Sequence, residues 1–232
     1  IIAVPILNIY GFLNFSRDVP DGKDVNRSFP GNKEGSLASR VAHRFMKEVM
    51  PYIDYGVDFH TGGSSRGNYP QIRCVLAEPK NQQLADAFAA PFTMNASYRQ
   101  GSLRKEAAKL GKHILVYETG ESLRFDERGI KLGIDGTLRL MHHLGMGASA
   151  PAPTAPTPIC MKDIWVRAKK AGLFRSHVQE GGYVKKGQVV GTITDPYGEM
   201  EVRLNAPAAG YIVGLNNMPV VNQGDALMHI AF

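Results

Sequence analysis

The chain has 232 residues, of which 44% are hydrophobic and 21% are charged, and its formal net charge is +6. This is ordinary composition for a globular protein with a buried core, and the length fits one large domain or two smaller ones. The lysines and arginines are scattered and no basic run alternates with aromatic residues, so we expect no nucleic-acid binding; a small anionic molecule suits the mild positive charge.

The chain begins with the apolar stretch "IIAVPILNIYGF". Pro5 and Asn8 interrupt it, so it has the pattern of neither a signal peptide nor a membrane helix, and we expect no membrane partner. We predict that Ile1–Ile9 is a buried strand and that a further segment precedes it.

The rest of the first half alternates predicted helices and strands. Leu37, Val41, Phe45 and Val49 recur every four residues, which predicts an amphipathic helix over Ser36–Met50. Strands are predicted at "YGVDFH" and "HILVYETG", and helices at "NQQLADAFAA", "GSLRKEAAKLG" and residues 126–144, the last with the apolar stripe Ile130, Ile134, Leu138 and Met141. The alternation predicts an α/β fold with a sheet covered by helices on both faces.

The residue pattern changes after the stretch "GMGASAPAPTAPTP" over residues 145–158. Its Ala, Pro and Thr residues are typical of an extended linker, although an irregular surface crossing within one domain is the alternative. Beyond it, short β-branched runs are punctuated by Gly, which predicts a small all-β barrel or sandwich. We therefore predict a catalytic domain over 1–146, a linker over 147–158 and a β-domain over 159–232.

The stretch "DVNRSFPG" contains a cationic residue that turn chemistry does not explain. Asp24, Asn26 and the Pro-Gly end suit a tight turn, but Arg27 gains nothing from one. A guanidinium beside an amide is suited to gripping a carboxylate, and Arg17 lies a few residues upstream.

Three further polar residues lie at predicted strand or helix ends. His60 ends the strand in "DFHTGG", Arg104 begins the helix in "GSLR", and Glu118 closes the apolar strand in "YETG", where burial should raise the pKa of its carboxyl. Each has a simpler interpretation as a structural histidine, a surface charge or an exposed strand terminus. Their coincidence on one α/β unit favours a functional site, because such sites gather at the carboxyl ends of strands. The other histidines are weaker candidates, on polar helix faces or without ligand neighbours: His43, His113, His142, His143, His177 and His229.

The order "VPILN…SR…DVNRSFPG…DFHTGG…GSLR…YETG" resembles the succinylglutamate desuccinylase and aspartoacylase family, relatives of the zinc carboxypeptidases. The resemblance extends over residues 1–145, and residues 159–232 are similar to the β-domain that follows in many members. It implies a zinc carboxypeptidase-like fold, with a mixed, mostly parallel sheet flanked by helices. It implies a cytoplasmic, zinc-dependent hydrolase that cleaves the C–N amide bond of a small, anionic N-acylated amino acid. His60 would be the third protein ligand of one zinc ion.

The resemblance also implies roles for the other polar residues. Asn26 and Arg27 would hold the substrate carboxylate, and Arg104 would add a further contact. Arg17 would stabilise the oxyanion near the scissile carbonyl. Glu118 would be the general base that takes a proton from zinc-bound water and returns it to the leaving amine. We expect Asp24 to orient the Arg27 loop.

One departure from the family is clear, because its first two zinc ligands come from a His-x-x-Glu stretch that this sequence lacks. His43 is followed by "RFM", which supplies no Glu. We expect the two further ligands upstream of this chain. The alternative is a metal-free relative that binds a carboxylate without catalysis.

The second half resembles biotinyl and lipoyl carrier domains in "GGYVKKGQVVGTI" and "NAPAAGYIVG". Between these stretches "DPYGEMEVRL" contains no Lys, so we predict that no biotin or lipoyl group is attached. We expect the β-domain to shape the active-site entrance or to form a homo-oligomer interface. Cys74 and Cys160 lack disulfide or metal-ligand spacing, and we expect both to be reduced and buried, with a disulfide as the alternative.

Overall fold

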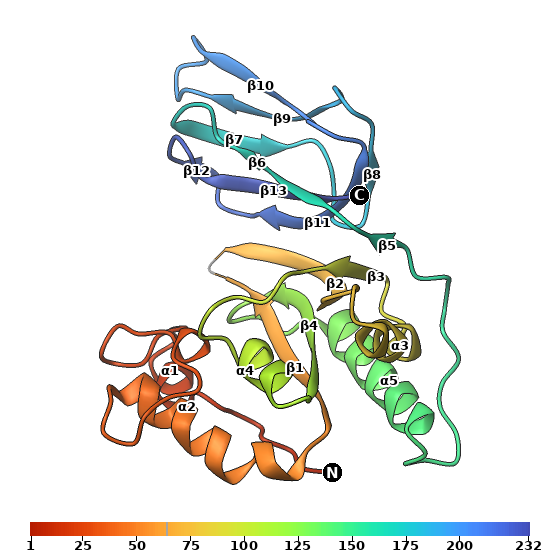
Figure 1. The fold of residues 1–232 in the computed structure, drawn as a ribbon. Coiled ribbons are helices and arrows are strands. Elements are labelled where there is room, and N and C mark those ends of the chain that lie inside the picture. Colours follow the sequence, from red (N-terminus) through yellow and green to blue (C-terminus); the bar gives the residue numbers. More distant parts are fainter. Residues whose placement is uncertain (64) are drawn as a thin grey trace.

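The computed structural model describes residues 1–63 and 65–232. In the α/β half, a mixed sheet is flanked by helices on both faces, as the sequence predicts (Figure 1). Its strands are β1 (Tyr55–Gly62), β2 (Arg66–Cys74), β3 (Phe92–Asn95), β4 (His113–Glu121) and β5 (Ile159–Cys160). The helices are α1 (Ile9–Leu13), α2 (Leu37–Glu48), α3 (Pro79–Phe88), α4 (Leu103–Lys109) and α5 (Glu127–His143), with 3-10 turns at Val25–Arg27 and Met50–Tyr52.

Strand pairing in this half is mostly parallel. The β1–β4, β2–β3 and β3–β5 pairs are parallel, whereas β2 and β4 run antiparallel. Helices α2 and α4 cover one face of the sheet and α3 and α5 the other (Figure 1). Because side chains alternate along a strand, Ile114 of β4 packs with α2 and α4, while Leu115 and Tyr117 pack with α3 and α5.

Helix α5 meets the sheet through glycines rather than through its predicted apolar stripe. A Cβ at Gly136 would lie 2.3 Å from the Phe88 ring, and one at Gly133 would lie 3.0 Å from Tyr117, so the backbone approaches the aromatic core closely. The stripe residues Ile130, Ile134 and Leu138 are 41–56% exposed and line a shallow apolar groove beside β1.

The predicted N-terminal strand is wrong. Residues 1–8 form no strand and pair with none of the described strands, and Ile1 is 88% exposed. Pro5 has no N–H to donate to a ladder. Asn8 instead caps α1, accepting a hydrogen bond from the Gly11 N–H at 2.9 Å and donating to the Arg17 carbonyl.

The second half is all β, as predicted, but its strands continue the sheet of the first half. Strand β11 pairs antiparallel with β2, and the main strand order is β1-β4-β2-β11-β13-β6. A second, antiparallel sheet has the order β10-β9-β7-β12, and an apolar core lies between the two sheets. The strands are β6 (Asp163–Arg167), β7 (Gly172–Ser176), β8 (Tyr183–Val184), β9 (Val189–Thr194), β10 (Glu201–Asn205), β11 (Gly210–Asn216), β12 (Val220–Val221) and β13 (Ala226–Ala231).

Both cysteines are free and buried, as expected. They lie on β2 and β5, the two strands that flank β3, and burial raises the pKa of the Cys74 thiol to about 12. Among the described helices, none is long and apolar enough to cross a membrane.

Candidate active site

His60 and Glu118 lie side by side on neighbouring strands. They are register partners in the parallel β1–β4 pair, and both point to the face that α2 and α4 cover. The His60 Nδ1 atom is 3.7 Å from Glu118 Oε1. Its Nε2 is 2.9 Å from Oδ2 of Asp58, which lies two residues earlier on the same face of β1. The imidazole is therefore held between two carboxylates.

Strand β2 brings two more groups to Glu118. The Asn68 side chain donates a hydrogen bond to Oε2 at 2.8 Å, and Arg73 Nη1 lies 3.9 Å from Oε1. Only 13% of the Glu118 side chain is exposed. The carboxylate is thus oriented by three neighbours from β1 and β2.

The prediction of a raised Glu118 pKa is wrong. Burial alone would raise the pKa, but the nearby His60 imidazole, the Arg73 charge and the hydrogen bond from Asn68 outweigh it and lower the pKa below its ordinary value. Burial likewise disfavours the charged imidazole, yet Asp58 and Glu118 together raise the pKa of His60 to about 10. Because its pKa is lowered, the Glu118 carboxylate is ionised at neutral pH.

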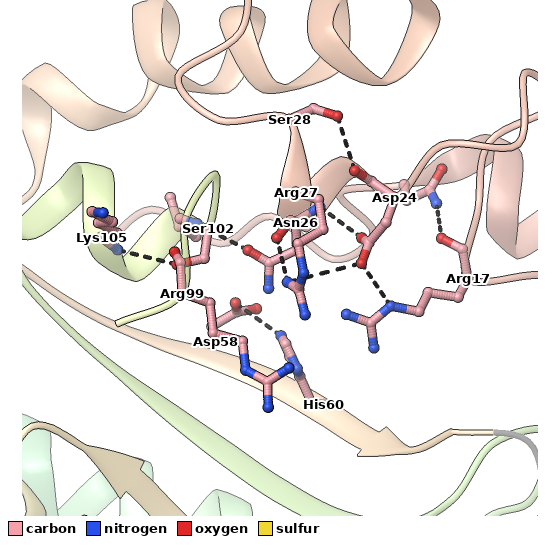
Figure 2. A network of polar contacts seen from close by, with 12 residues as sticks. Arg17, Asp24, Asn26, Arg27, Ser28, Asp58, His60, Arg99, Ser102 and Lys105 are labelled. Carbon is pink, nitrogen blue, oxygen red and sulfur yellow. Dashed lines mark hydrogen bonds and ion pairs between the residues drawn. The ribbon is translucent and has the colours of Figure 1, made fainter. Parts of the chain in front are cut away.

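The Arg27 loop is organised by Asp24, as the sequence predicts. Asp24 Oδ1 accepts from the Asn26 N–H at 2.8 Å and caps the 3-10 turn, while Oδ2 accepts from Arg17 Nε at 2.9 Å and lies 3.9 Å from Arg27 Nη1. Asn26 Oδ1 accepts from the Leu103 N–H and ties this loop to α4. In Figure 2, the Arg17 and Arg27 guanidiniums extend from the loop toward His60.

Arg104 is anchored to the protein backbone. Its guanidinium donates to the carbonyls of Arg73, Ala96 and Ser97 at 3.2–3.4 Å. Burial lowers its pKa from the ordinary arginine value, and nearby Tyr98, Cys74 and Asp58 offset part of that effect. Arg104 thereby holds the loop that follows β3 against the end of β2.

All six residues that the sequence singles out line one cavity of about 720 Å³: Arg17, Asn26, Arg27, His60, Arg104 and Glu118. Arg66, Arg73 and Arg99 line it as well, so the cavity is strongly cationic. Figure 2 shows Arg99 reaching the space beside His60 from a different segment than Arg17 and Arg27. The β half closes another side of the cavity with Met161, Asp163, Trp165 and His229.

A model of the succinylglutamate desuccinylase/aspartoacylase catalytic domain matches residues 1–144. The chain belongs to this family. The resemblance inferred from the order of motifs is thereby confirmed, and with it the expectation of a deacylating hydrolase.

Three relatives match all or nearly all of the chain. The N-alpha-acetyl-L-2,4-diaminobutyric acid deacetylase of Halomonas elongata is 28% identical over 251 residues, which span 100% of this chain and 72% of that protein. The structure of a succinylglutamate desuccinylase/aspartoacylase from Rhodobacter sphaeroides has a TM-score of 0.89 and 26% identity over 98% of this chain and 73% of its own. The product-bound ectoine utilization protein EutE (DoeB) from Ruegeria pomeroyi has the same TM-score and coverage, with 24% identity.

Sequence reasoning missed several residues of this desuccinylase/aspartoacylase-type cavity. Asp58 could have been predicted as a neighbour of His60, because a residue two positions earlier on a strand lies on the same face. Asn68, Arg73 and Arg99 lie outside the motifs that identify the other site residues. The sequence shows no ligand neighbour for His229, yet the ring lies 2.9 Å from Asp163, which is 66 residues away in the chain.

The described residues do not complete the zinc site that this family implies. They contain no group of three or more His, Cys, Asp and Glu side chains that could hold a metal ion. His60 suits one ligand position, because a carboxylate behind a ligating imidazole orients the ring. Zinc sites need three or four protein ligands, so one imidazole is not enough.

Proposed function

We propose that the protein is a zinc-dependent deacylase that hydrolyses the C–N amide bond of a small N-acylated amino acid. The observation that carries this proposal is the position of Glu118: an ionised carboxylate beside His60, in a cavity whose lining includes six arginines. A diamino acid derivative, such as the one in the name of the Halomonas relative, belongs to this substrate class.

Arg27 and Asn26 are suited to binding the substrate carboxylate. The Asn26 amide oxygen is occupied by Leu103, which leaves its NH₂ group to donate. Arg17 uses Nε for Asp24 and keeps its two Nη groups for the substrate. Asp24 limits the freedom of both arginines before the substrate arrives, which lowers the entropic cost of binding.

Glu118 is suited to moving the proton of the reaction. As a carboxylate it accepts a proton from the attacking water, and it then returns that proton to the leaving amine. Asn68 and Arg73 hold it in one orientation throughout. The guanidiniums of the cavity, Arg17 among them, stabilise the negative charge that develops on the carbonyl oxygen.

His60 would supply one zinc ligand, and the remaining ligands must come from outside the residues described here. When bound, a zinc ion would provide Lewis acidity and lower the pKa of a bound water to about 7. Asp58 would keep the imidazole in the orientation needed for binding.

Two measurements test this function separately. Metal analysis of the purified full-length protein should find about one zinc ion per chain in the wild type and in His143→Ala, and much less in His60→Ala. His143 is an exposed histidine at the end of α5, so it controls for general loss of surface histidines. Equal zinc content in both variants would refute the His60 assignment.

The second measurement is amine release from a panel of N-acyl amino acids by the zinc-replete protein. Release from at least one of them is expected, and release from none would refute the deacylase. The incomplete ligand set favours one alternative, a metal-free carboxylate-binding protein. Tight binding of these compounds with neither zinc nor turnover would establish it.

A further inference from the structure

Arg99 differs from the other arginines of the cavity, because its guanidinium is free. Within the described part of the chain, its exposed side chain makes no ion pair and no hydrogen bond. Each of the other five lies against an acidic side chain, backbone carbonyls or an aromatic ring: Arg17, Arg27, Arg66, Arg73 and Arg104. An exposed arginine on a mobile loop would simply be solvated, so the question is how firmly this loop is held.

The backbone before Arg99 is fixed by contacts of Tyr98 and Arg104. Arg104 donates to two carbonyls of the loop at 3.2 Å, and its guanidinium carbon lies 5.6 Å from the centre of the Tyr98 ring. The Tyr98 hydroxyl donates to the Glu78 carboxylate at 2.9 Å. A fixed backbone restricts the positions that the Arg99 side chain can reach, which lowers the entropic cost of binding a ligand.

The backbone after Arg99 is tied to the turn that carries Arg27. The Phe29 N–H donates to the Gly101 carbonyl at 3.0 Å. The hydrogen bond at 2.9 Å that the Asn26 side chain accepts from the first N–H of α4 is a second link. The loop that follows β3 and the Arg27 turn are therefore held together as one unit.

Gly101 is the point of closest approach between these two segments. Its φ is +71°, and a Cβ there would lie 2.4 Å from the Arg27 carbonyl oxygen and 3.2 Å from Arg27 Cα, so only glycine fits. Because Arg99 is two residues away, the Cα atoms of the two arginines are at most about 12 Å apart. Figure 2 shows both guanidiniums pointing into the same space beside His60.

We propose that Arg99 and Arg27 together bind the substrate carboxylate, and that Gly101 is the positioning residue that sets the spacing between them. This inference rests on the proposed deacylase function. A carboxylate has two oxygens with about four lone-pair sites, so it can accept hydrogen bonds from guanidiniums on two sides. Arg27 approaches from the 3-10 turn and Arg99 from the loop after β3, and the contact at Gly101 fixes the distance between the two backbones.

The first test is the kinetics of Arg99→Ala. With the full-length, zinc-replete protein and the best substrate of the N-acyl amino acid panel, KM should rise by about tenfold to a hundredfold while kcat stays within about threefold. Arg175→Ala removes an exposed arginine on β7 that does not line the cavity, and it should leave both parameters unchanged. An unchanged KM in Arg99→Ala, or a fall in kcat alone, would overturn the binding role.

The second test compares two glycines of equal backbone geometry. Gly111 also has a φ of +71°, but a Cβ there would meet nothing within 4 Å. Gly101→Ala should therefore raise KM by about tenfold, whereas Gly111→Ala, with the same backbone strain, should not. In the Arg99→Ala background the effect of Gly101→Ala should be clearly smaller, because one of the two positioned groups is absent. The same fold-increase in both backgrounds would overturn the positioning role.

Calorimetric binding of L-alanine and L-alaninamide gives a readout without turnover, since the two differ in the carboxylate alone. The wild type should prefer L-alanine by about tenfold to a hundredfold, and Arg99→Ala should lose most of this preference. That result supports the two-arginine site even if the protein releases no amine, which would refute the deacylase alone. Equal binding of both compounds by the wild type, or an unchanged preference in Arg99→Ala, overturns the site and leaves the deacylase standing.

Discussion

The two faces of strand β4 differ in what they contact, and the consecutive residues Tyr117 and Glu118 point to opposite faces. Tyr117 faces α3 and α5, packs against Phe88 with ring centroids 5.2 Å apart, and donates to the Gly129 carbonyl at 2.8 Å. Its neighbour Glu118 faces the cationic cavity and is held by side chains from β1 and β2. Strand alternation thus separates the packing face from the face of the proposed proton-transfer residue, so substitutions on one face should change stability and those on the other should change turnover.

Glu118→Gln should produce the largest effect. The amide keeps the shape of the side chain but cannot accept a proton, so kcat should fall by about 10²–10⁴-fold with little change in KM. Steady-state kinetics on the best N-acyl amino acid measure this. Arg27→Ala is the contrast on the same face and should mainly raise KM, and the same kinetic pattern in both variants would refute this division of roles.

Gly136→Ala tests the packing of α5 on the apolar face of the sheet. The new methyl group would meet the Phe88 ring at 2.3 Å, so we expect a loss of about 1–3 kcal/mol in unfolding free energy and an unchanged kcat. Urea unfolding followed by circular dichroism measures the loss. Gly147→Ala, whose Cβ would have no atom nearer than 3.9 Å, is the control. An equally stable Gly136→Ala protein would show that α5 does not depend on this close approach.

The smallest effect should come from the pH dependence of His229. Its folded-state pKa is lowered mainly by burial, so below about pH 6.5 the unfolded chain binds a proton that the folded chain resists. This contribution to stability is present above pH 6.5 and is lost as the pH falls. His229→Asn should therefore make the unfolding free energy change less steeply with pH between pH 7 and 5. The slope should decrease by at most about 1.4 kcal/mol per pH unit. An unchanged slope would contradict the neutral buried ring.

Local patterns predicted most of the fold. The four-residue apolar spacing located α2, alternating strands and helices predicted a sheet covered by helices on both faces, and turn chemistry explained the position of Asp24 in its loop. The same logic failed at residues 1–8, because an apolar run forms a strand only where a neighbouring strand accepts its hydrogen bonds.

The site was predicted less completely, for a physical reason. Strand ends and family motifs located His60 and Glu118, but the direction of the Glu118 pKa depends on Arg73 and Asn68, which a different strand supplies. The Asp163–His229 pair joins residues 66 positions apart and belongs to the half of the chain without catalytic motifs. Contacts of this kind depend on strand register, which no short stretch of sequence contains.

The shared sheet also has a consequence for the nascent chain on the ribosome. The Gln71 side chain of β2 donates to the Val213 carbonyl of β11 at 3.0 Å, across 142 residues of sequence. At about 5–20 residues per second, translation separates these partners by roughly 7–30 s. During that interval residues 66–68 of β2, which pair with β11, lack that partner strand, and an open strand edge is a template for aggregation. We therefore expect the emerging polypeptide to need chaperone protection most while residues 72–213 are being synthesised.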